Sequence, residues 1–253
     1  MARRRNNNRR RRRGRFVFLY KLLSILVICG VIIAALTLFF RVDSVEIQGN
    51  QRYTVDEIRK ESGVETGDNL FLLNKYRIAN NLLNELPYIE KVRISRHLPD
   101  QLVIHVTECT TVLAVIQNGS AWLVSPSGKI VEQTTVSDVS QYAVIDGFQM
   151  LSPSVASSLA METALSNRHD SLLALLDALE KSSMLEQVNA IHLSDASILT
   201  MDYAGRFTVE FTYGADYAYK LQNLQAVIGK LESNETGTIN LRVDGKANFI
   251  PGK

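Results

Sequence analysis

An uninterrupted apolar run near the amino terminus constrains this chain more than any other feature. From Leu22 to Phe40, 19 consecutive residues carry no charged side chain, and residues 16–20 before Lys21 are also uncharged. About 19–25 helical residues at ~1.5 Å each span roughly 28–37 Å, which is enough to cross a hydrocarbon layer about 30 Å thick. Lys21 can extend its ammonium group back to the interface. The sequence therefore predicts one transmembrane helix over residues 16–40.

An arginine cluster precedes this run and predicts its orientation. Nine of the first 15 residues are arginine, and basic residues beside a span stay on the cytoplasmic side. We therefore expect a cytoplasmic tail over residues 1–15 and an extracytoplasmic region beyond residue 40. A cleaved signal peptide shares the basic start, but its apolar region is usually shorter, about 7–15 residues. A nucleic-acid-binding tail is the other interpretation. Membrane topology and attraction to anionic lipids explain the arginines more simply.

The rest of the chain differs from this tail in charge and must fold on its own core. Residues 41–253 contain 18 basic and all 26 acidic residues, a net charge of −8, whereas residues 1–40 carry +10. Cys29 lies in the apolar run and Cys109 is the only other cysteine. No disulfide can therefore form within residues 41–253, and about 210 residues are enough to bury an ordinary core. For Cys109 we expect a small, buried, apolar role.

Residues 41–109 predict a small module of strand, helix, helix, strand and strand. Alternating residues indicate a half-buried strand over 42–48. Thr54 with Glu57 forms a capping-box pattern that opens a short helix, and a second helix is capped by Asn74 and ended by Pro87. Two alternating strands then flank a turn at 98–100. We expect two helices to cover one face of a three-stranded sheet.

Four stretches of this module resemble the juxtamembrane POTRA module of the FtsQ/DivIB family of bacterial division proteins. They are VEIQGN (45–50), GDNLF (67–71), LPY (86–88) and VRISRHLPDQLVIHVTE (92–108). The combination with a preceding basic anchor is specific, although no single stretch is. After Glu108 the chain departs from the family's usual Arg and Pro-X-Ala-like step. Further on, YGADYAYKLQNL and INLRVDGKANFIP resemble the carboxyl end of the same family.

Residues 110–253 predict a second, mixed domain. Leucines at 172, 175, 176 and 179 follow helical spacing, with Asp170 or Ser171 as the cap. A helix over 155–166 and another containing Leu221 to Leu231 are also expected. The expected strands are 112–117, 121–124, 129–133, 142–147, 188–193, 198–203, 207–211 and 238–243. Overall we expect an α+β fold: a transmembrane helix, a POTRA module and a domain with a mainly antiparallel sheet and flanking helices.

Motifs for catalysis, metals or cofactors are missing from the sequence. The four histidines show no metal-ligand spacing, and no Gly-X-Ser-X-Gly occurs. Four Gly-Lys pairs lack the glycine that a phosphate loop needs five residues earlier. Asp195 and Asp202 could meet in space, but solvated turn residues are the default interpretation. We therefore expect no enzyme activity, catalytic residue, cofactor, metal or small-molecule substrate.

The expected mechanism is docking of a partner protein at a strand edge. An unpaired strand offers N–H and C=O groups that another chain can complete. We expect the terminal strand, Thr238–Val243, to be such an edge. The resemblance implies that FtsB/DivIC-like and FtsL-like membrane proteins bind there, and it carries the contact over to Leu241, Arg242, Val243, Asp244, Lys246 and Phe249. Arg242 could hold a partner carboxylate and Phe249 could be an apolar anchor. In the alternative, the strand is paired internally and Phe249 belongs to the core.

The resemblance implies a single-pass type II scaffold of the bacterial cell membrane at the division septum, which helps to regulate septal peptidoglycan synthesis. Two alternatives remain open. A POTRA-type chaperone would bind many exported, unfolded chains rather than one partner set. A membrane-tethered cell-wall enzyme would require a cluster of strongly perturbed carboxylate or histidine groups in a deep cleft.

Overall fold

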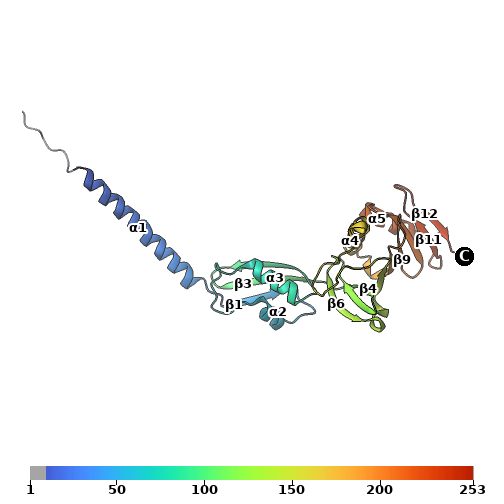
Figure 1. Ribbon diagram of the computed structural model, residues 1–253, viewed down its shortest axis with the longest axis horizontal. Helices are drawn as coiled ribbons and strands as arrows, with labels where there is room; N and C mark the ends of the chain where they lie inside the picture. The colour runs from blue at the N-terminus through green and yellow to red at the C-terminus, as the bar shows by residue number, and fades with distance from the viewer. Residues whose placement is uncertain (1–9, 253) are drawn as a thin grey trace, which may run out of the picture.

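The computed structural model describes residues 10–252, with side chains from residue 17 onward. Figure 1 shows one long helix followed by two folded parts arranged one after the other. Helix α1 (Arg10–Phe39) begins inside the expected tail, and residues 1–9 of that tail lie outside the described part. Within α1, Val17–Phe39 is long and apolar enough to cross a membrane. Its length and composition suggest that this helix anchors the chain.

The juxtamembrane module confirms the predicted order of strand, helix, helix, strand and strand. Its elements are β1 (Ser44–Gln48), α2 (Val55–Ser62), α3 (Lys75–Glu85), β2 (Ile89–His97) and β3 (Gln101–Glu108). The three-stranded sheet has the order β1-β3-β2, with β1 parallel and β2 antiparallel to β3. Both predicted caps are present: Thr54 and Glu57 form a capping box, and the Asn74 side chain accepts from the amides of Tyr76 and Arg77.

The distal domain contains one nine-stranded mixed sheet, in the order β12-β11-β10-β9-β8-β7-β4-β5-β6. Five of its eight strand pairs are antiparallel, as the sequence predicted for most of the sheet. The strands are β4 (Leu113–Gln117), β5 (Ser120–Val124), β6 (Ile130–Thr135), β7 (Ala143–Asp146), β8 (Val188–His192), β9 (Ile198–Tyr203), β10 (Phe207–Thr212), β11 (Gly237–Asn240) and β12 (Asn248–Pro251).

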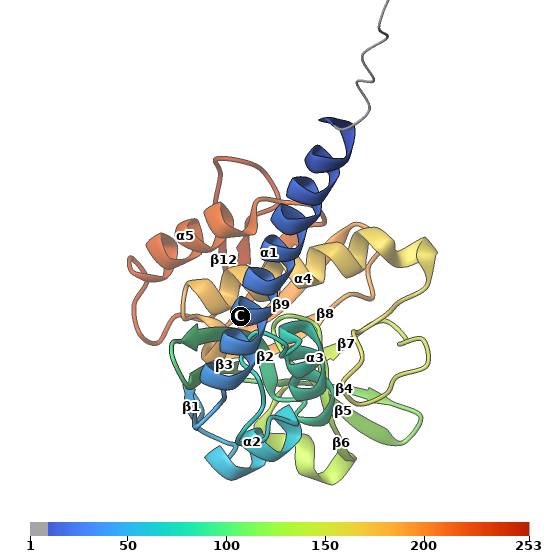
Figure 2. The same cartoon turned by 90° about the vertical axis from the view of Figure 1, so that its left-hand side faces the viewer.

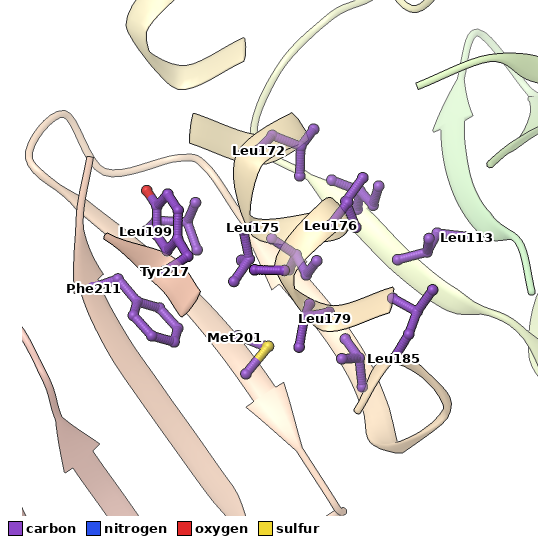
Figure 3. Packing of buried hydrophobic residues seen from close by; sticks show 14 of the residues in the cluster. Leu113, Leu172, Leu175, Leu176, Leu179, Leu185, Leu199, Met201, Phe211 and Tyr217 are labelled. Atoms are coloured by element: carbon purple, nitrogen blue, oxygen red, sulfur yellow. The ribbon is translucent and has the colours of Figure 1, made fainter. Parts of the chain in front are cut away.

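Helices α4 (Ser166–Lys181) and α5 (Tyr217–Ile228) pack on this sheet and lie next to each other in Figure 2. The four leucines of the predicted stripe in α4 are fully buried. They contact residues of the strands, including Leu199, Met201 and Phe211, as Figure 3 shows. This burial supplies the main core of the distal domain, at about 1.5–3 kcal/mol for each large side chain.

The predicted helix over 155–166 is wrong. Instead of forming a helix, this segment bonds to the start of β6: Ile130 N–H donates to Ser157 O, and Ala156 N–H donates to Ile130 O. A single 3₁₀ turn, Thr163–Leu165, precedes α4. Helix α4 therefore begins at Ser166, before the expected cap at Asp170 or Ser171, and the Ser171 hydroxyl accepts instead from Gly214 N–H.

The expectation that Thr238–Val243 forms an edge strand is also wrong. Strand β11 ends at Asn240 and lies between β10, to which it is parallel, and β12, to which it is antiparallel. The chain turns back after residue 243, and the last segment pairs with β11. The outermost strand on this side is therefore β12, which the sequence interpretation had treated as a tail.

Candidate partner-binding site

Strand β12 ends the sheet on one side, and its outer backbone groups are open among the described residues. Antiparallel pairs alternate between residues that bond to the neighbour and residues that point away from it. Gly252 N–H donates to Thr236 O at 2.7 Å, so Ile250 and Asn248 share its inward direction. Phe249 therefore directs its N–H and C=O outward. Pro251 also faces outward but has no N–H to offer. The edge is therefore short and offers few backbone groups, which limits the strands that can pair with it.

The opposite edge of the sheet is partly covered. At β6, the backbone of Ile130 exchanges two hydrogen bonds with residues 156–157, and Lys129 forms an isolated bridge with Ser158. This segment closes the first part of the β6 edge. Among the described residues, no such segment pairs with the outer side of β12.

The two faces of β12 differ sharply. Phe249 lies opposite Ile239 and packs against the core, with its ring centroid 6.2 Å from that of Phe207 in an edge-to-face arrangement. Ile250 lies opposite Thr238 on the other face and is 58% exposed. A strand added beside β12 could therefore cover Ile250, whereas Phe249 mainly holds β12 in place.

The loop between β11 and β12 contains most of the residues predicted to contact a partner. Leu241 is fully buried and its N–H donates to Glu210 O at 2.9 Å, so it is a core residue. Arg242 and Lys246 are exposed. Val243 is 55% exposed. The structure therefore separates the predicted set: Leu241 and Phe249 point into the domain, whereas the other four residues face solvent.

Asp244 has a structural partner in this loop. Its carboxylate Oδ1 lies 2.6 Å from the Nζ atom of Lys220, whose side chain is only 1% exposed although that of Asp244 is 92% exposed. Among the described residues, Nζ has no hydrogen bond of good geometry, so the contact is an ion pair by distance. A buried ammonium group without its carboxylate would be costly. Lys220 in α5 thereby holds the loop that leads into β12.

Two further residues at this edge were missed by sequence reasoning. Ile250 is the exposed isoleucine of β12, and Lys220 holds the loop between β11 and β12 through its ion pair with Asp244. The adjacent apolar residues Phe249 and Ile250 could have indicated a strand, but four residues ending in proline gave a weak signal. No sequence spacing connects Lys220 with Asp244.

A second polar cluster lies on the sheet surface, at β7, β8 and β9. His192 Nδ1 is 2.9 Å from Asp146 Oδ2, and its Nε2 is 3.3 Å from Asp202 Oδ2. Thr208 donates to the other oxygen of Asp202 at 2.9 Å. Asp202 thus meets His192, whereas Asp195 caps the following turn by accepting from Ser197 N–H. Sequence reasoning proposed neither contact with His192.

The pKa of His192 reflects two opposing effects. Partial burial lowers the pKa, while the hydrogen bonds and charges of Asp146 and Asp202 raise it, and the net pKa lies above the usual 6.5. The side chains of His192, Asp146 and Asp202 are 34%, 51% and 42% exposed. The cluster therefore lies on an open surface and acts as a polar tie across three strands.

Hydrogen bonds and a cation–π contact join the module to the distal domain, which contains the candidate edge. Tyr88 donates to Glu132 of β6 at 2.6 Å, and the Arg52 guanidinium lies 3.7 Å from the centre of the Tyr88 ring. Lys129 Nζ donates to the carbonyls of Leu83 and Ile89. Burial and the neighbouring Glu132 raise the pKa of Tyr88, and burial lowers the pKa of Lys129.

Cys109 lies at the junction of the module and the distal domain. Its thiol is buried and donates to Thr111 O at 2.9 Å. Burial, followed by the charges of Glu90 and Glu180, raises the pKa of the thiol to about 12. A thiol with this pKa is a poor nucleophile, which agrees with the expected packing role.

Comparison with known families matches two parts of the chain. Residues 40–108 match the model described as POTRA domain, FtsQ-type, and residues 114–242 match the model described as cell division protein FtsQ/DivIB, C-terminal. The second match ends before β12. The candidate edge strand therefore lies just beyond the part that the family model covers.

Individual relatives agree with these matches. The chain is 30% identical over 122 residues to cell division protein DivIB of Clostridium botulinum strain Hall, covering 48% of this chain and 47% of the relative. It is 26% identical over 198 residues to cell division protein FtsQ of Syntrophotalea carbinolica, covering 77% and 67%. With DivIB of Staphylococcus aureus it shares 27% identity over 109 residues, covering 43% and 25%. The chain thus spans about half the length of the clostridial relative.

Proposed function

The chain belongs to the FtsQ/DivIB family of cell division proteins, and from that premise we propose that it is a membrane-anchored scaffold of the divisome. It would bind FtsB/DivIC-like and FtsL-like bitopic proteins outside the membrane. Through them it would help to regulate septal peptidoglycan synthesis. The proposed contact is strand addition at β12, which replaces the edge first expected at Thr238–Val243.

The open edge of β12 carries this proposal. The outward N–H and C=O of Phe249 can pair with a partner strand, and the exposed Ile250 gives that strand an apolar contact. Val243, Arg242 and Lys246 in the adjoining loop would contact the same partner at its flank. Exposed basic residues beside an edge also discourage indiscriminate pairing.

Membrane anchoring adds to the affinity of such a short contact. Helix α1 would confine the chain to the same bilayer as its partners, which raises their effective concentration, so weak individual contacts suffice. We propose the cytoplasmic orientation of the amino terminus from the arginine cluster. We also propose septal localisation, which follows from the division role of the family.

Binding, rather than catalysis, is the proposed mode of action. Among the described residues, His192 with its two aspartates is the cluster whose residue types most resemble a catalytic site. This cluster lies on an open sheet surface. A catalytic site usually excludes water around the reacting groups. The chaperone alternative predicts capture of many unfolded chains, whereas the scaffold predicts one set of partners.

Co-purification of the full-length chain with tagged FtsB/DivIC-like and FtsL-like proteins measures partner binding at β12. Ile250→Glu places a charge on the exposed face of β12 and should reduce partner recovery about tenfold or more, because a strand would have to bury it. Val136→Glu serves as the matched control, since Val136 is a similarly exposed apolar residue at the other end of the sheet.

Equal partner recovery with Ile250→Glu and with the unaltered chain would refute docking at β12. Because Ile250 is exposed, the variant should keep the unfolding midpoint of the unaltered chain. Depletion of the protein should give filamentous, undivided cells, which checks the division role separately from the docking surface.

A further inference from the structure

The last turn of α1 is capped by a side chain from the juxtamembrane module. The final four carbonyls of a helix have no partner within it, and in an apolar surrounding each unpaired carbonyl is costly. Asn69 Nδ2 donates to Leu36 O at 2.9 Å and to Thr37 O at 3.4 Å. The Oδ1 atom of the same side chain accepts from the amides of Phe71 and Leu72. One asparagine thereby joins the end of the span to the loop between α2 and α3.

Backbone hydrogen bonds also hold the loop between α2 and α3 beside the end of α1. Leu70 N–H donates to Phe40 O at 2.9 Å, and Val42 exchanges hydrogen bonds with Asp68 and Gly67. The rings of Phe40 and Phe71 meet edge to face, with centroids 5.1 Å apart. The loop therefore cannot leave the end of α1 without breaking several hydrogen bonds.

Large apolar side chains project from this end of the module. Leu72 is 78% exposed and Phe71 is 44% exposed, while Tyr76 in the first turn of α3 is 84% exposed. Leu98, in the turn between β2 and β3, is 57% exposed. That turn lies at the same end, because the amides of Asp43 and Ser44 donate to Asp100 O.

The depth of the loop follows from the length of the span. At about 1.5 Å per residue, the 23 residues of Val17–Phe39 extend for roughly 35 Å, slightly more than a hydrocarbon layer of about 30 Å. Leu36 to Phe39 therefore lie where hydrocarbon meets headgroups. Asn69 places Phe71 and Leu72 at that depth, where the Phe and Leu side chains of interfacial segments are buried between headgroups and acyl chains.

We propose that this juxtamembrane surface, formed by Phe71, Leu72, Tyr76 and Leu98, inserts into the lipid interface. Arg77 lines the same shallow hollow as Leu72, together with Asp68, Asn69 and Asn74, and its guanidinium suits a lipid phosphate. Lipid contact around the end of α1 would fix the tilt of the module on the membrane. The proposal requires α1 to lie in a bilayer but does not depend on partner binding at β12.

Tryptophan fluorescence of the full-length chain in nanodiscs of phosphatidylethanolamine and phosphatidylglycerol tests this proposal. The chain contains a single tryptophan, Trp122, so Leu72→Trp in a Trp122→Phe background gives one probe. We expect blue-shifted emission, and loss of most of it when the lipids carry bromine near the ester end of their acyl chains. Bromine at mid-chain should quench less, because the surface lies at the interface.

Ile116→Trp in the same background is the matched control, since Ile116 is exposed to the same extent as Phe71 but belongs to the distal domain. Its emission should resemble that of tryptophan in water and should not respond to brominated lipid. The proposal is overturned when Leu72→Trp is quenched no more than Ile116→Trp. That result would leave the surface available to a protein instead, and it would not affect the edge at β12.

Discussion

At the residue scale, a few side chains hold the candidate edge and its surroundings in place. Lys220 fixes the loop before β12 through Asp244, and Phe249 fixes β12 itself by packing on the core. Both roles are structural, although Asp244 and Phe249 were predicted as partner contacts. The residues left for a partner are those that the domain does not use, chiefly Ile250 and Val243.

His192 gives a prediction about pH at the same scale. Its pKa is raised in the folded chain, so its stabilising contribution is fully present below the usual value of 6.5 and is lost as pH rises through the raised value. The midpoint of thermal unfolding of the full-length chain in detergent should therefore include a component that falls as pH increases from about 6 to 8. Variants of two aspartates test whether this pH-dependent component comes from His192.

Asp146→Asn should remove most of this component, because it removes the closer carboxylate. Asp195→Asn is the control: Asp195 caps a nearby turn without a contact to His192 in the described structure, so the pH-dependent component should persist. An unchanged pH profile for Asp146→Asn would contradict the assigned role of the cluster.

The structural roles of residues were predictable where neighbours in the sequence determine them. Thr54, Glu57 and Asn74 cap helices as expected, because capping depends on residues within three positions. The contacts of His192, Lys220 and Asn69 were not predictable, because each joins segments that lie far apart in the sequence. Such pairs depend on the strand order, which the sequence pattern does not determine.

At the element scale, β12 depends on close approach to β11. Gly237 has φ of 152°, and a Cβ there would overlap the carbonyl oxygen of Ile250. Gly237→Ala should therefore displace β12 and reduce partner recovery severely, while the eight other strands of the sheet and the helices packed on it remain folded. The expected cost in stability is about 1–3 kcal/mol.

Gly245→Ala provides the matched control for this prediction. Gly245 also has positive φ, 69°, but nothing lies within 4 Å of an added Cβ, and it belongs to the turn that leads into β12. It should share a backbone penalty of about 1–2 kcal/mol and still bind partner. Partner recovery could be measured beside circular dichroism for both variants, and equal recovery for the two would contradict the role assigned to β12.

Elements with strong periodicity were predicted well, and short ones were not. Helix α4, the module and most strands of the sheet follow clear apolar patterns. The segment 155–166 has helical composition in part, but its backbone bonds to β6 instead. Strand β12 has four residues and ends in proline, so its pairing depends on β11 rather than on its own propensity.

At the scale of the whole molecule, the chain connects a long apolar helix, the proposed membrane anchor, to a sheet edge at its far end (Figure 1). Asn69 joins α1 to the module, and Tyr88, Glu132 and Lys129 join the module to the distal domain. These contacts would set the direction in which β12 faces from the membrane. The general plan of an anchor and two folded parts was predicted from the sequence, whereas the location of the open edge required the sheet order.

The central claim, that a partner strand completes β12, is tested most directly by amide hydrogen exchange of the full-length chain in nanodiscs. Exchange at Phe249 should be fast in the free chain and strongly slowed when an FtsB/DivIC-like partner is present, because its N–H points outward. The inward amide of Ile250 should change less. Partner binding that leaves the Phe249 amide exchanging at its free rate would contradict the claim.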